Sequence, residues 1–292
     1  MLPLSSWISP ITNIDPKSRG TSAHGFSRIM RGKFMKLNEG FEKTVTSETV
    51  ERWRYPRFFG ENSGETALIT GTDAVHISRV LRMKSGDLAI VCDGNGTDCL
   101  CRIVSAEEKG VVLEVLDRRS SEGEPTVTVR LFQCLPKSDK MDFIVQKAVE
   151  LGAAEVIPVI SKRCVSRPDA KTAAKKAERW QRIAEEAAKQ CGRGRIPEVR
   201  DMLTFGEAVK AHGDGVGILF YECGGEHLNS LVAPETRLID VYIGSEGGFE
   251  ENEAELAKNA GIIPATLGTR ILRCETAPVA ALAVLMNLTN NM

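Results

Sequence analysis

Two short segments in the last third of the sequence hold the residues best suited to binding and chemistry. The first is Tyr242-Ile243-Gly244-Ser245-Glu246-Gly247-Gly248-Phe249, which is rich in glycine and carries one carboxylate. The second is Leu267-Gly268-Thr269-Arg270-Ile271-Leu272-Arg273-Cys274-Glu275-Thr276, which brings two arginines into an otherwise acidic region. Because glycine has no side chain, such loops let a ligand approach the backbone closely. Both segments are therefore candidate parts of one site.

The first segment does not have the features of a phosphate-binding loop. It lacks the Lys-Ser/Thr pair of a P-loop, and the helix expected after it opens with Glu250, Glu251 and Glu253. These acids occupy the positive end of the helix dipole, where a phosphate would meet like charge. Together with Glu246 they favour a neutral or cationic ligand, such as an adenosine that bears a sulfonium. A tight turn followed by ordinary N-terminal acids is the alternative.

The second segment also allows two interpretations. Arg270 and Arg273 could neutralise neighbouring carboxylates, or one of them could contact a phosphate or an electron-rich base. Thr276 is expected to cap the final helix, with Pro278 in its first turn. That helix, at 277–288, is apolar nearly all round, so either the core of the chain or a partner subunit must bury it.

Alternating strands and helices after Pro125 are expected to position these segments. The predicted strands are 127–135, 156–160, 216–221, 238–244 and 262–267. The predicted helices are 140–151, a long helix through 173–187 that ends at Gly192, and 250–260. This alternation predicts an α/β domain with a mostly parallel sheet covered on both faces. Ligands of such sheets bind outside the carboxyl ends of strands, which is where both segments lie.

The sequence before residue 125 has a different rhythm. Thr72 and Asp73 are expected to cap a short helix with one apolar face, made of Val75, Ile77, Val80 and Leu81. Antiparallel strands are predicted at 88–92, 99–104 and 111–116, and a small β-barrel is their natural closure. Residues 1–50 show no periodicity and few acids near the start, as in a transit peptide or an upstream extension, and do not enter the fold argument.

Charge is distributed unevenly along a chain whose net charge is only -1. Residues 136–200 hold 15 Lys and Arg against 9 Asp and Glu, whereas residues 201–292 hold 5 against 13 and the part before residue 136 is nearly balanced. The basic residues concentrate in two segments, 162–167 and 189–195. A local basic surface on a neutral protein suits contact with a polyanion, although a solvated charged loop gives the same pattern.

Cysteine usage argues against a metal site. The eight cysteines are scattered, with no CxxC pair and no clustering with the four histidines. Free thiols fit a reducing compartment, and no apolar run has the length of a membrane helix. We therefore expect a cytoplasmic protein without a metal and without a membrane partner.

Six motifs in order make the chain resemble a known family. They are Pro56-Arg57-Phe58-Phe59, His76-Ile77-Ser78-Arg79-Val80-Leu81-Arg82, Lys140-Met141-Asp142-Phe143-Ile144-Val145-Gln146-Lys147-Ala148-Val149-Glu150-Leu151-Gly152, Gln190-Cys191-Gly192-Arg193, Gly244-Ser245-Glu246-Gly247-Gly248 and Leu272-Arg273-Cys274-Glu275-Thr276-Ala277. Their order and spacing resemble those of 16S ribosomal RNA (uracil-N3)-methyltransferases of the SPOUT class. The match runs from about residue 55 to the end.

The resemblance implies a fold and a function. It implies a small PUA-like β-barrel at 51–122 that binds RNA and a SPOUT methyltransferase domain at 123–292 whose mostly parallel sheet forms a trefoil knot. Residues 1–50 would be a poorly ordered extension. The implied activity is S-adenosylmethionine-dependent methylation of N3 of one uridine in 16S ribosomal RNA or the small ribosomal subunit, by a homodimer. The alternatives are a SPOUT enzyme for another RNA base and a non-catalytic RNA-binding or ribosome-assembly protein.

The resemblance also assigns site residues. Arg273 would face the reacting base, and Glu275 or water would accept the proton that the base loses. The predicted cofactor-binding residues are Leu219, Ile243, Gly244, Glu246, Gly247, Gly248, Leu267, Gly268, Ile271 and Leu272. The predicted RNA-binding residues are Arg57, Arg82, Lys162, Arg163, Arg193 and Arg195. Ser245 stands where the family usually has proline, which is expected to loosen the turn.

Overall fold

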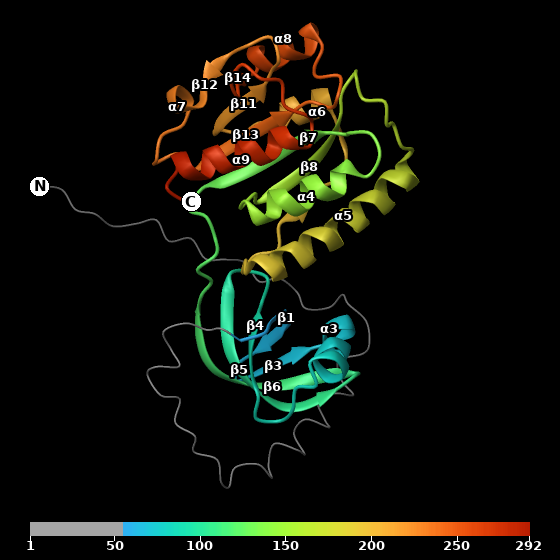
Figure 1. The fold of residues 1–292 in the computed structure, drawn as a ribbon, viewed down its shortest axis with the longest axis vertical. Helices are drawn as coiled ribbons and strands as arrows, with labels where there is room; N and C mark the ends of the chain where they lie inside the picture. The colour runs from blue at the N-terminus through green and yellow to red at the C-terminus, as the bar shows by residue number, and fades with distance from the viewer. Residues whose placement is uncertain (1–54) are drawn as a thin grey trace, which may run out of the picture. The chain divides into compact units, whose positions relative to one another are not determined.

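A computed structural model describes residues 55–292, which form two β-sheets with their helices (Figure 1). The predicted extension at 1–50 lies outside the described residues. The first sheet runs in the order β1-β4-β5-β6-β3-β2. Its strands are β1 (Arg57–Phe59), β2 (Glu61–Ser63), β3 (Thr66–Ile69), β4 (Leu88–Cys92), β5 (Thr97–Glu107) and β6 (Gly110–Ser120).

The antiparallel pairing of β4, β5 and β6 confirms the predicted meander. Between β4 and β5 the Asp93 side chain accepts hydrogen bonds from the amides of Asn95 and Thr97, at 2.8 and 3.0 Å, which fixes the turn. The sheet packs around its own apolar core, in which Ile69 and Leu113 are fully buried. Strands β1 to β3 were not predicted, because each has only three or four residues.

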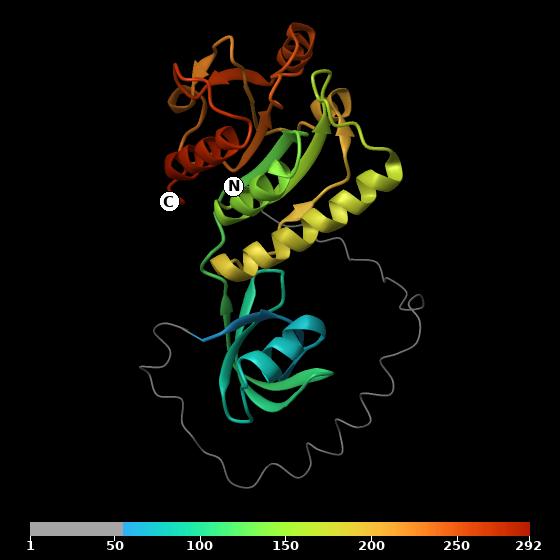
Figure 2. The same ribbon diagram turned by 45° about the vertical axis from the view of Figure 1, so that its right-hand side comes forward.

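The short helix next to this sheet differs from its prediction. It consists of α3 (Gly71–Val75) followed by a π-helical turn, η1 (His76–Val80), as Figure 2 shows beside the strands. Ile77 is fully buried, but Val75, Val80 and Leu81 are exposed, so the predicted apolar face is wrong in three of its four residues. A π-helical turn bonds i to i+5, which rotates the later side chains away from the face that a 3.6-residue period predicts.

The second sheet is parallel and runs in the order β10-β8-β7-β13-β11-β14-β12, with β9 beside β8. Its strands are β7 (Thr128–Cys134), β8 (Glu155–Ile160), β9 (Glu198–Val199), β10 (Leu203–Thr204), β11 (Val216–Phe220), β12 (Glu226–His227), β13 (Leu238–Ile243) and β14 (Ile263–Thr266). The five predicted strands of this half are β7, β8, β11, β13 and β14, so the α/β prediction is confirmed.

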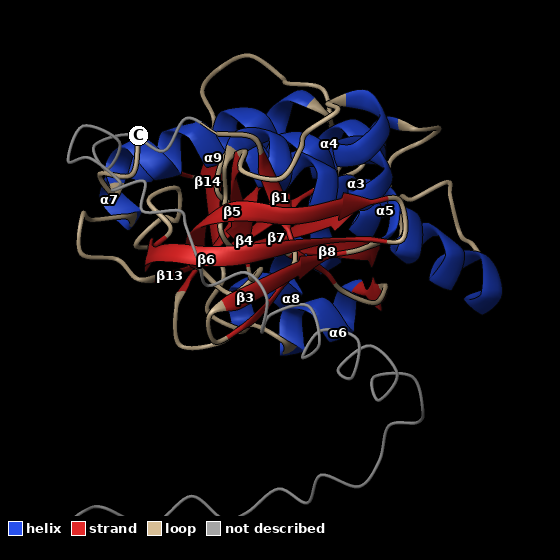
Figure 3. Ribbon diagram, turned by 90° about the horizontal axis from the view of Figure 1, so that it is seen from below, coloured by secondary structure: helices blue, strands red, loops and turns tan. Residues whose placement is uncertain are grey.

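Helices cover both faces of the parallel sheet. They are α4 (Lys140–Glu150), α5 (Ala170–Cys191), α6 (Phe205–Lys210), α7 (Leu228–Leu231), α8 (Glu251–Asn259) and α9 (Thr276–Leu288). Figures 1 and 3 place α4, α5 and α9 together on one face and α6 and α8 on the other. Burial on both faces explains why the central strands are nearly all apolar rather than alternating.

The strand order gathers three segments that are far apart in the sequence. Strand β13 lies between β7 and β11, and β14 lies on the other side of β11. Because the strands are parallel, the segments that follow β11, β13 and β14 leave the sheet at one edge. The knotted path implied by the family resemblance remains a prediction.

Candidate active site

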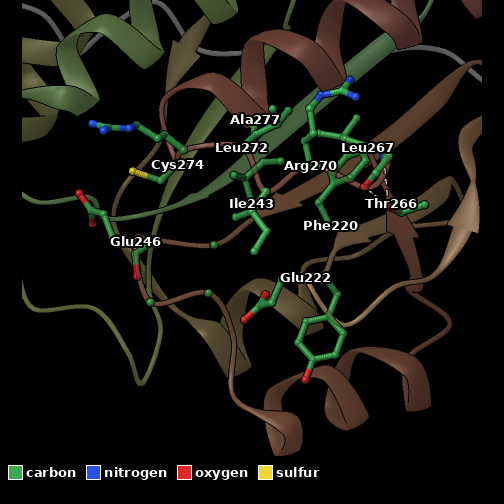
Figure 4. Close-up of a pocket in the computed structure, with 18 of the residues that line it drawn as sticks. Phe220, Glu222, Ile243, Glu246, Thr266, Leu267, Arg270, Leu272, Cys274 and Ala277 are labelled. Atoms are coloured by element: carbon green, nitrogen blue, oxygen red, sulfur yellow. Dashed lines mark hydrogen bonds between the residues drawn. The ribbon is translucent and has the colours of Figure 1, made fainter.

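A pocket of about 540 Å³ lies at the carboxyl ends of β11, β13 and β14. Its wall is built by the residues after β11, the glycine-rich loop after β13 and the loop after β14, together with Lys140 from α4 and Ala277 from α9 (Figure 4). Apolar side chains of Ile243, Leu267 and Leu272 share the wall with carboxylates. This is the position where parallel α/β sheets bind their ligands.

The loop after β13 forms a tight turn. Ser245 and Gly248 pair as an isolated bridge, and the Gly248 amide donates to the Ser245 carbonyl at 3.0 Å. Gly248 has a φ of +67°, and a Cβ atom there would lie only 2.3 Å from a carboxylate oxygen of Glu222. The backbone conformation therefore favours glycine at this position, and a side chain there would displace the Glu222 carboxylate. Serine in place of the family's proline is compatible with this turn.

The loop after β14 forms the opposite wall of the pocket. The Gly268 amide donates to the Thr266 hydroxyl at 3.1 Å, and Gly268 has a φ of +104°. Helix α9 then begins at Thr276, whose amide donates to the carbonyl of Arg273 at 2.8 Å. The prediction that Thr276 caps α9 is wrong, because Glu275 holds the N-cap position and Thr276 is already inside the helix.

Lys140 joins the two loops through a pair of salt bridges. Its Nζ atom lies 3.0 Å from a carboxylate oxygen of Glu246 and 3.0 Å from one of Glu275. The Glu246 carboxylate also accepts the backbone amide of Lys137 at 3.2 Å. One ammonium from α4 thus fixes the glycine-rich loop relative to the start of α9.

The ionisation of this cluster follows from its contacts. The hydrogen bond from Lys140 is the main cause that lowers the pKa of Glu275. Burial raises the pKa of Glu246, but hydrogen bonds from Lys140 and from backbone amides outweigh it and the pKa is lowered. The same two carboxylates raise the pKa of Lys140. At neutral pH the cluster therefore holds two negative charges and one positive charge, a net charge of about -1.

Arg273 lines the pocket with its guanidinium exposed. Within residues 55–292 no hydrogen bond or salt bridge reaches this guanidinium, because Lys140 already engages Glu246 and Glu275. Of the two interpretations of this arginine, neutralisation of neighbouring carboxylates is therefore not what the structure shows. The side chain is available to a ligand.

Nine of the ten predicted cofactor-binding residues line the pocket; they are Ile243, Gly244, Glu246, Gly247, Gly248, Leu267, Gly268, Ile271 and Leu272. Leu219 does not. It is fully buried inside the sheet, opposite Tyr242 and Pro264, and the residues that reach the pocket from β11 are the next three, Phe220, Tyr221 and Glu222.

Two of the predicted RNA-binding arginines are engaged in salt bridges within the protein: Arg193 is buried, and Arg57 has 14% of its side chain exposed. Arg57 makes two hydrogen bonds of 2.6 Å to the carboxylate of Asp98. Arg193 is only 5% exposed and donates to Glu124 at 2.9 Å and to two backbone carbonyls. These predictions are corrected, because each guanidinium is already paired with a largely buried carboxylate, Asp98 or Glu124.

The other predicted RNA-binding residues have different surroundings. Arg163 turns toward the glycine-rich loop, where it donates to the Gly247 carbonyl at 2.9 Å. Lys162 is half-exposed and lies 3.3 Å from a carboxylate oxygen of Glu250. Arg82 and Arg195 are exposed, so with Lys162 they remain the candidates for phosphate contact.

Glu246 and Glu222 are the carboxylates of the pocket lining, which also holds Lys140, Arg270 and Arg273. The acids at the start of α8, to which the sequence pointed, are absent from the pocket lining. Glu253 is buried and its carboxylate accepts the backbone amides of Lys162 and Glu250, at 2.9 and 3.0 Å. A neutral or cationic ligand in this pocket would therefore meet Glu222 or Glu246 rather than the acids at the helix start.

Lys140 and Glu222 are the pocket residues that sequence reasoning missed. Lys140 lies more than 100 residues before Glu246 in the chain, and no local pattern indicates that it reaches the glycine-rich loop. Glu222 follows the end of β11 by two residues. The rule that ligands bind at the carboxyl ends of strands would have found Glu222, had it been applied to this strand as well.

The described part of the chain holds neither a metal cluster nor a membrane-spanning helix. Within residues 55–292 no group of three or more His, Cys, Asp or Glu side chains is arranged to hold a metal ion. Over the same residues no helix is both long and apolar enough to span a bilayer.

Comparison with known proteins gives consistent matches over both halves of the chain. The model of the RNA methyltransferase domain family matches residues 123–286, and that of the RNA methyltransferase PUA domain matches residues 69–116. Ribosomal RNA small subunit methyltransferase E of Bacillus subtilis is 35% identical over 228 residues, which cover 75% of this chain and 89% of that protein. The protein of the same name from Synechocystis is 33% identical over 223 residues, 75% of this chain and 72% of that protein.

Comparison with solved structures gives the same kind of protein as the sequence comparison. The crystal structure of a ribosomal RNA small subunit methyltransferase E from Neisseria gonorrhoeae, bound to S-adenosyl methionine, has a TM-score of 0.73 and 33% identity. The match covers 80% of this chain and 98% of the Neisseria chain. The chain therefore belongs to the RNA methyltransferase family that includes the ribosomal RNA small subunit methyltransferases E.

Proposed function

We propose that the protein transfers a methyl group from S-adenosylmethionine to N3 of one uridine in 16S ribosomal RNA, as free RNA or within the small ribosomal subunit. The observation that carries the proposal is the pocket in which two glycine loops and two carboxylates meet Arg270 and Arg273, and Arg273 has no hydrogen-bond partner among residues 55–292. We place an RNA-binding PUA-like domain at 51–122 and the methyltransferase domain at 123–292.

The lining of the pocket fits the proposed cofactor. Ile243, Leu267 and Leu272 offer an apolar surface to an adenine ring, and the glycines leave the backbone open to it. Glu222 and Glu246 offer two carboxylates to the hydroxyls and cationic groups of the cofactor. S-adenosylmethionine, when bound, supplies a methyl group on a positively charged sulfur.

Methylation at N3 of uracil requires the base to be unpaired and to lose a proton. Arg273 is the proposed catalytic residue, since its guanidinium can stabilise the negative charge that develops on the uracil oxygens. Glu275 was the other candidate, as proton acceptor. Because Lys140 lowers the pKa of Glu275, this carboxylate is a weak base, and we propose that water accepts the proton while Glu275 holds Lys140 in place.

The RNA would be held by exposed cations, with Arg82 on the PUA-like domain and Lys162 and Arg195 on the methyltransferase domain as the proposed contacts. We also propose a homodimer, since Phe143 on α4 and Val284 on α9 are exposed apolar side chains on two helices in contact with each other. The cytoplasm is the proposed location, because ribosomal RNA is the substrate.

The proposal is tested by reconstitution. Purified protein is incubated with S-adenosylmethionine and with either 16S RNA or small subunits from cells that lack the protein, and the RNA is digested to nucleosides for mass spectrometry. We expect 3-methyluridine as the product, and none with Arg273→Ala. Another methylated nucleoside would favour an enzyme for a different base, and RNA binding without any methylation would favour a pure binding protein.

A further inference from the structure

We propose that Glu222 recognises the ribose of the cofactor, by accepting hydrogen bonds from its two vicinal hydroxyls. This inference rests on the proposed function, because it assigns a part of the same pocket to a part of S-adenosylmethionine. It adds a residue that determines cofactor specificity and that lies outside the glycine loops.

The position of Glu222 is fixed from two sides. The Gly248 backbone stands so close that a Cβ atom would lie 2.3 to 2.7 Å from the carboxylate atoms. Arg163 lies 3.6 Å from one carboxylate oxygen and donates to the neighbouring Gly247 carbonyl at 2.9 Å. The carboxylate thus rests on the glycine-rich loop, yet it remains partly exposed, with most of its acceptor capacity unused.

The place of Glu222 in the pocket points to the ribose rather than to another part of the cofactor. In Figure 4 its carboxylate points toward the middle of the pocket, between Glu246 at one end and Leu267 with Thr266 at the other. In an adenosyl sulfonium the ribose lies between the adenine and the sulfur. An adenine against Leu267 and a sulfur toward Glu246 would therefore bring the ribose to Glu222.

The chemistry of the two partners also matches. A carboxylate accepts hydrogen bonds through two oxygens, and a ribose offers two adjacent hydroxyl donors. Nucleotide-binding α/β domains use an acidic residue for the same purpose. The cationic part of the cofactor has another partner in the cluster of Lys140, Glu246 and Glu275, which carries a net charge of about -1.

Calorimetry with three probes tests the assignment. They are S-adenosylhomocysteine, its 2′,3′-dideoxy analogue, and 5′-methylthioadenosine, which keeps the ribose but lacks the amino acid. The variants are Glu222→Ala and Glu222→Gln, with Glu226→Gln as a control that removes an exposed acid outside the pocket. Melting temperatures establish that all variants are folded.

We expect Glu222→Ala to bind S-adenosylhomocysteine and 5′-methylthioadenosine about ten- to a hundredfold more weakly than the wild type, the usual worth of hydrogen bonds to a charged group. Glu222→Gln should lose less and Glu226→Gln nothing. For the dideoxy analogue the wild type and Glu222→Ala should bind equally.

Two results would overturn the inference. If Glu222→Ala weakens the dideoxy analogue as much as the parent compound, Glu222 does not contact the hydroxyls. If 5′-methylthioadenosine binding is unaffected, Glu222 faces the amino-acid part. Failure of the proposed function has a different signature: a wild type that binds none of the three probes would remove the cofactor from this pocket, whereas a different target base would leave all three affinities unchanged.

Discussion

Replacement of Arg193 by alanine is expected to destabilise the protein rather than to weaken RNA binding. The guanidinium is buried, and its three nitrogens donate to Glu124 and to the carbonyls of Ala153 and Val149. The variant would leave the Glu124 carboxylate without its cation and both carbonyls without these donors. An uncompensated buried charge is among the few causes of a large loss of stability.

The size of the effect can be worked out from the contacts. Removing one partner of a buried salt bridge costs about 3 to 5 kcal/mol. Glu124 keeps hydrogen bonds from the amides of Gly194 and Arg195, at 2.8 and 2.9 Å, and its side chain is 17% exposed. We therefore expect the lower end of the range, about 3 kcal/mol. For a folded unit of roughly 150 to 250 residues, a loss of about 3 kcal/mol lowers the melting temperature by roughly 6 to 12 °C.

Thermal and urea unfolding measure this loss, and a filter-binding titration with 16S RNA measures the affinity of the folded variant. Arg195→Ala is the matched control, because Arg195 is exposed and only two residues away. We expect the control to keep its melting temperature and to bind RNA more weakly, the reverse of the Arg193 variant. A melting temperature of Arg193→Ala within about 2 °C of the wild type, combined with weaker RNA binding, would refute this reasoning.

Four further predictions follow from the site. Arg273→Ala should bind S-adenosylmethionine almost normally but lose roughly 2 to 4 kcal/mol of transition-state stabilisation in single-turnover methylation, and a near-normal rate would remove Arg273 from the catalytic role. Gly248→Val should abolish cofactor binding in calorimetry, because the side chain would collide with the Glu222 carboxylate; unchanged affinity would place the cofactor elsewhere. Lys140→Met should raise the lowered pKa values of Glu246 and Glu275. We expect cofactor affinity to persist above the ordinary carboxylate pKa of 4.5 and to fall as acid protonates the two groups, so the fall should begin at a higher pH in the variant than in the wild type. Identical pH profiles would contradict this. Joint neutralisation of Lys162 and Arg195 should flatten the salt dependence of RNA affinity, whereas an unaltered slope would mean that both are merely solvated.

The α/β half of the fold could be predicted from the sequence because its signals are local. The long helix α5 ends at Gly192, which adopts the left-handed conformation with a φ of +82°, as its sequence position predicts. Strand β11 is a continuous apolar run, and β13 is apolar except for Asp240, which is typical of a sheet buried on both faces. Hydrophobic periodicity and glycine positions are both readable within windows of about 18 residues.

The antiparallel half of the fold was less predictable, because its short elements give only a weak local signal. Strands β1, β2 and β3 have three or four residues each, too few to show alternation. The π-helical turn η1 changes the helical period over five residues, and nothing in the sequence announced that change.

The site shows where local reasoning stops. Both glycine loops were found because glycine, arginine and acid patterns lie within ten residues of one another. The role of Lys140 could not be predicted, since only the folded sheet brings α4 beside Glu246 and Glu275. The burial of Arg193 was missed because an arginine on a glycine-rich loop has the same sequence pattern whether it faces a phosphate or a buried carboxylate.

The measurement that tests the account most directly is nucleoside mass spectrometry of 16S RNA from cells that lack this protein. The account predicts that 3-methyluridine disappears from the RNA, that the wild-type protein restores it, and that Arg273→Ala does not, although that variant is folded and binds cofactor. Unchanged 3-methyluridine in the deletion cells, or the loss of a different methylated nucleoside instead, would contradict the proposed function.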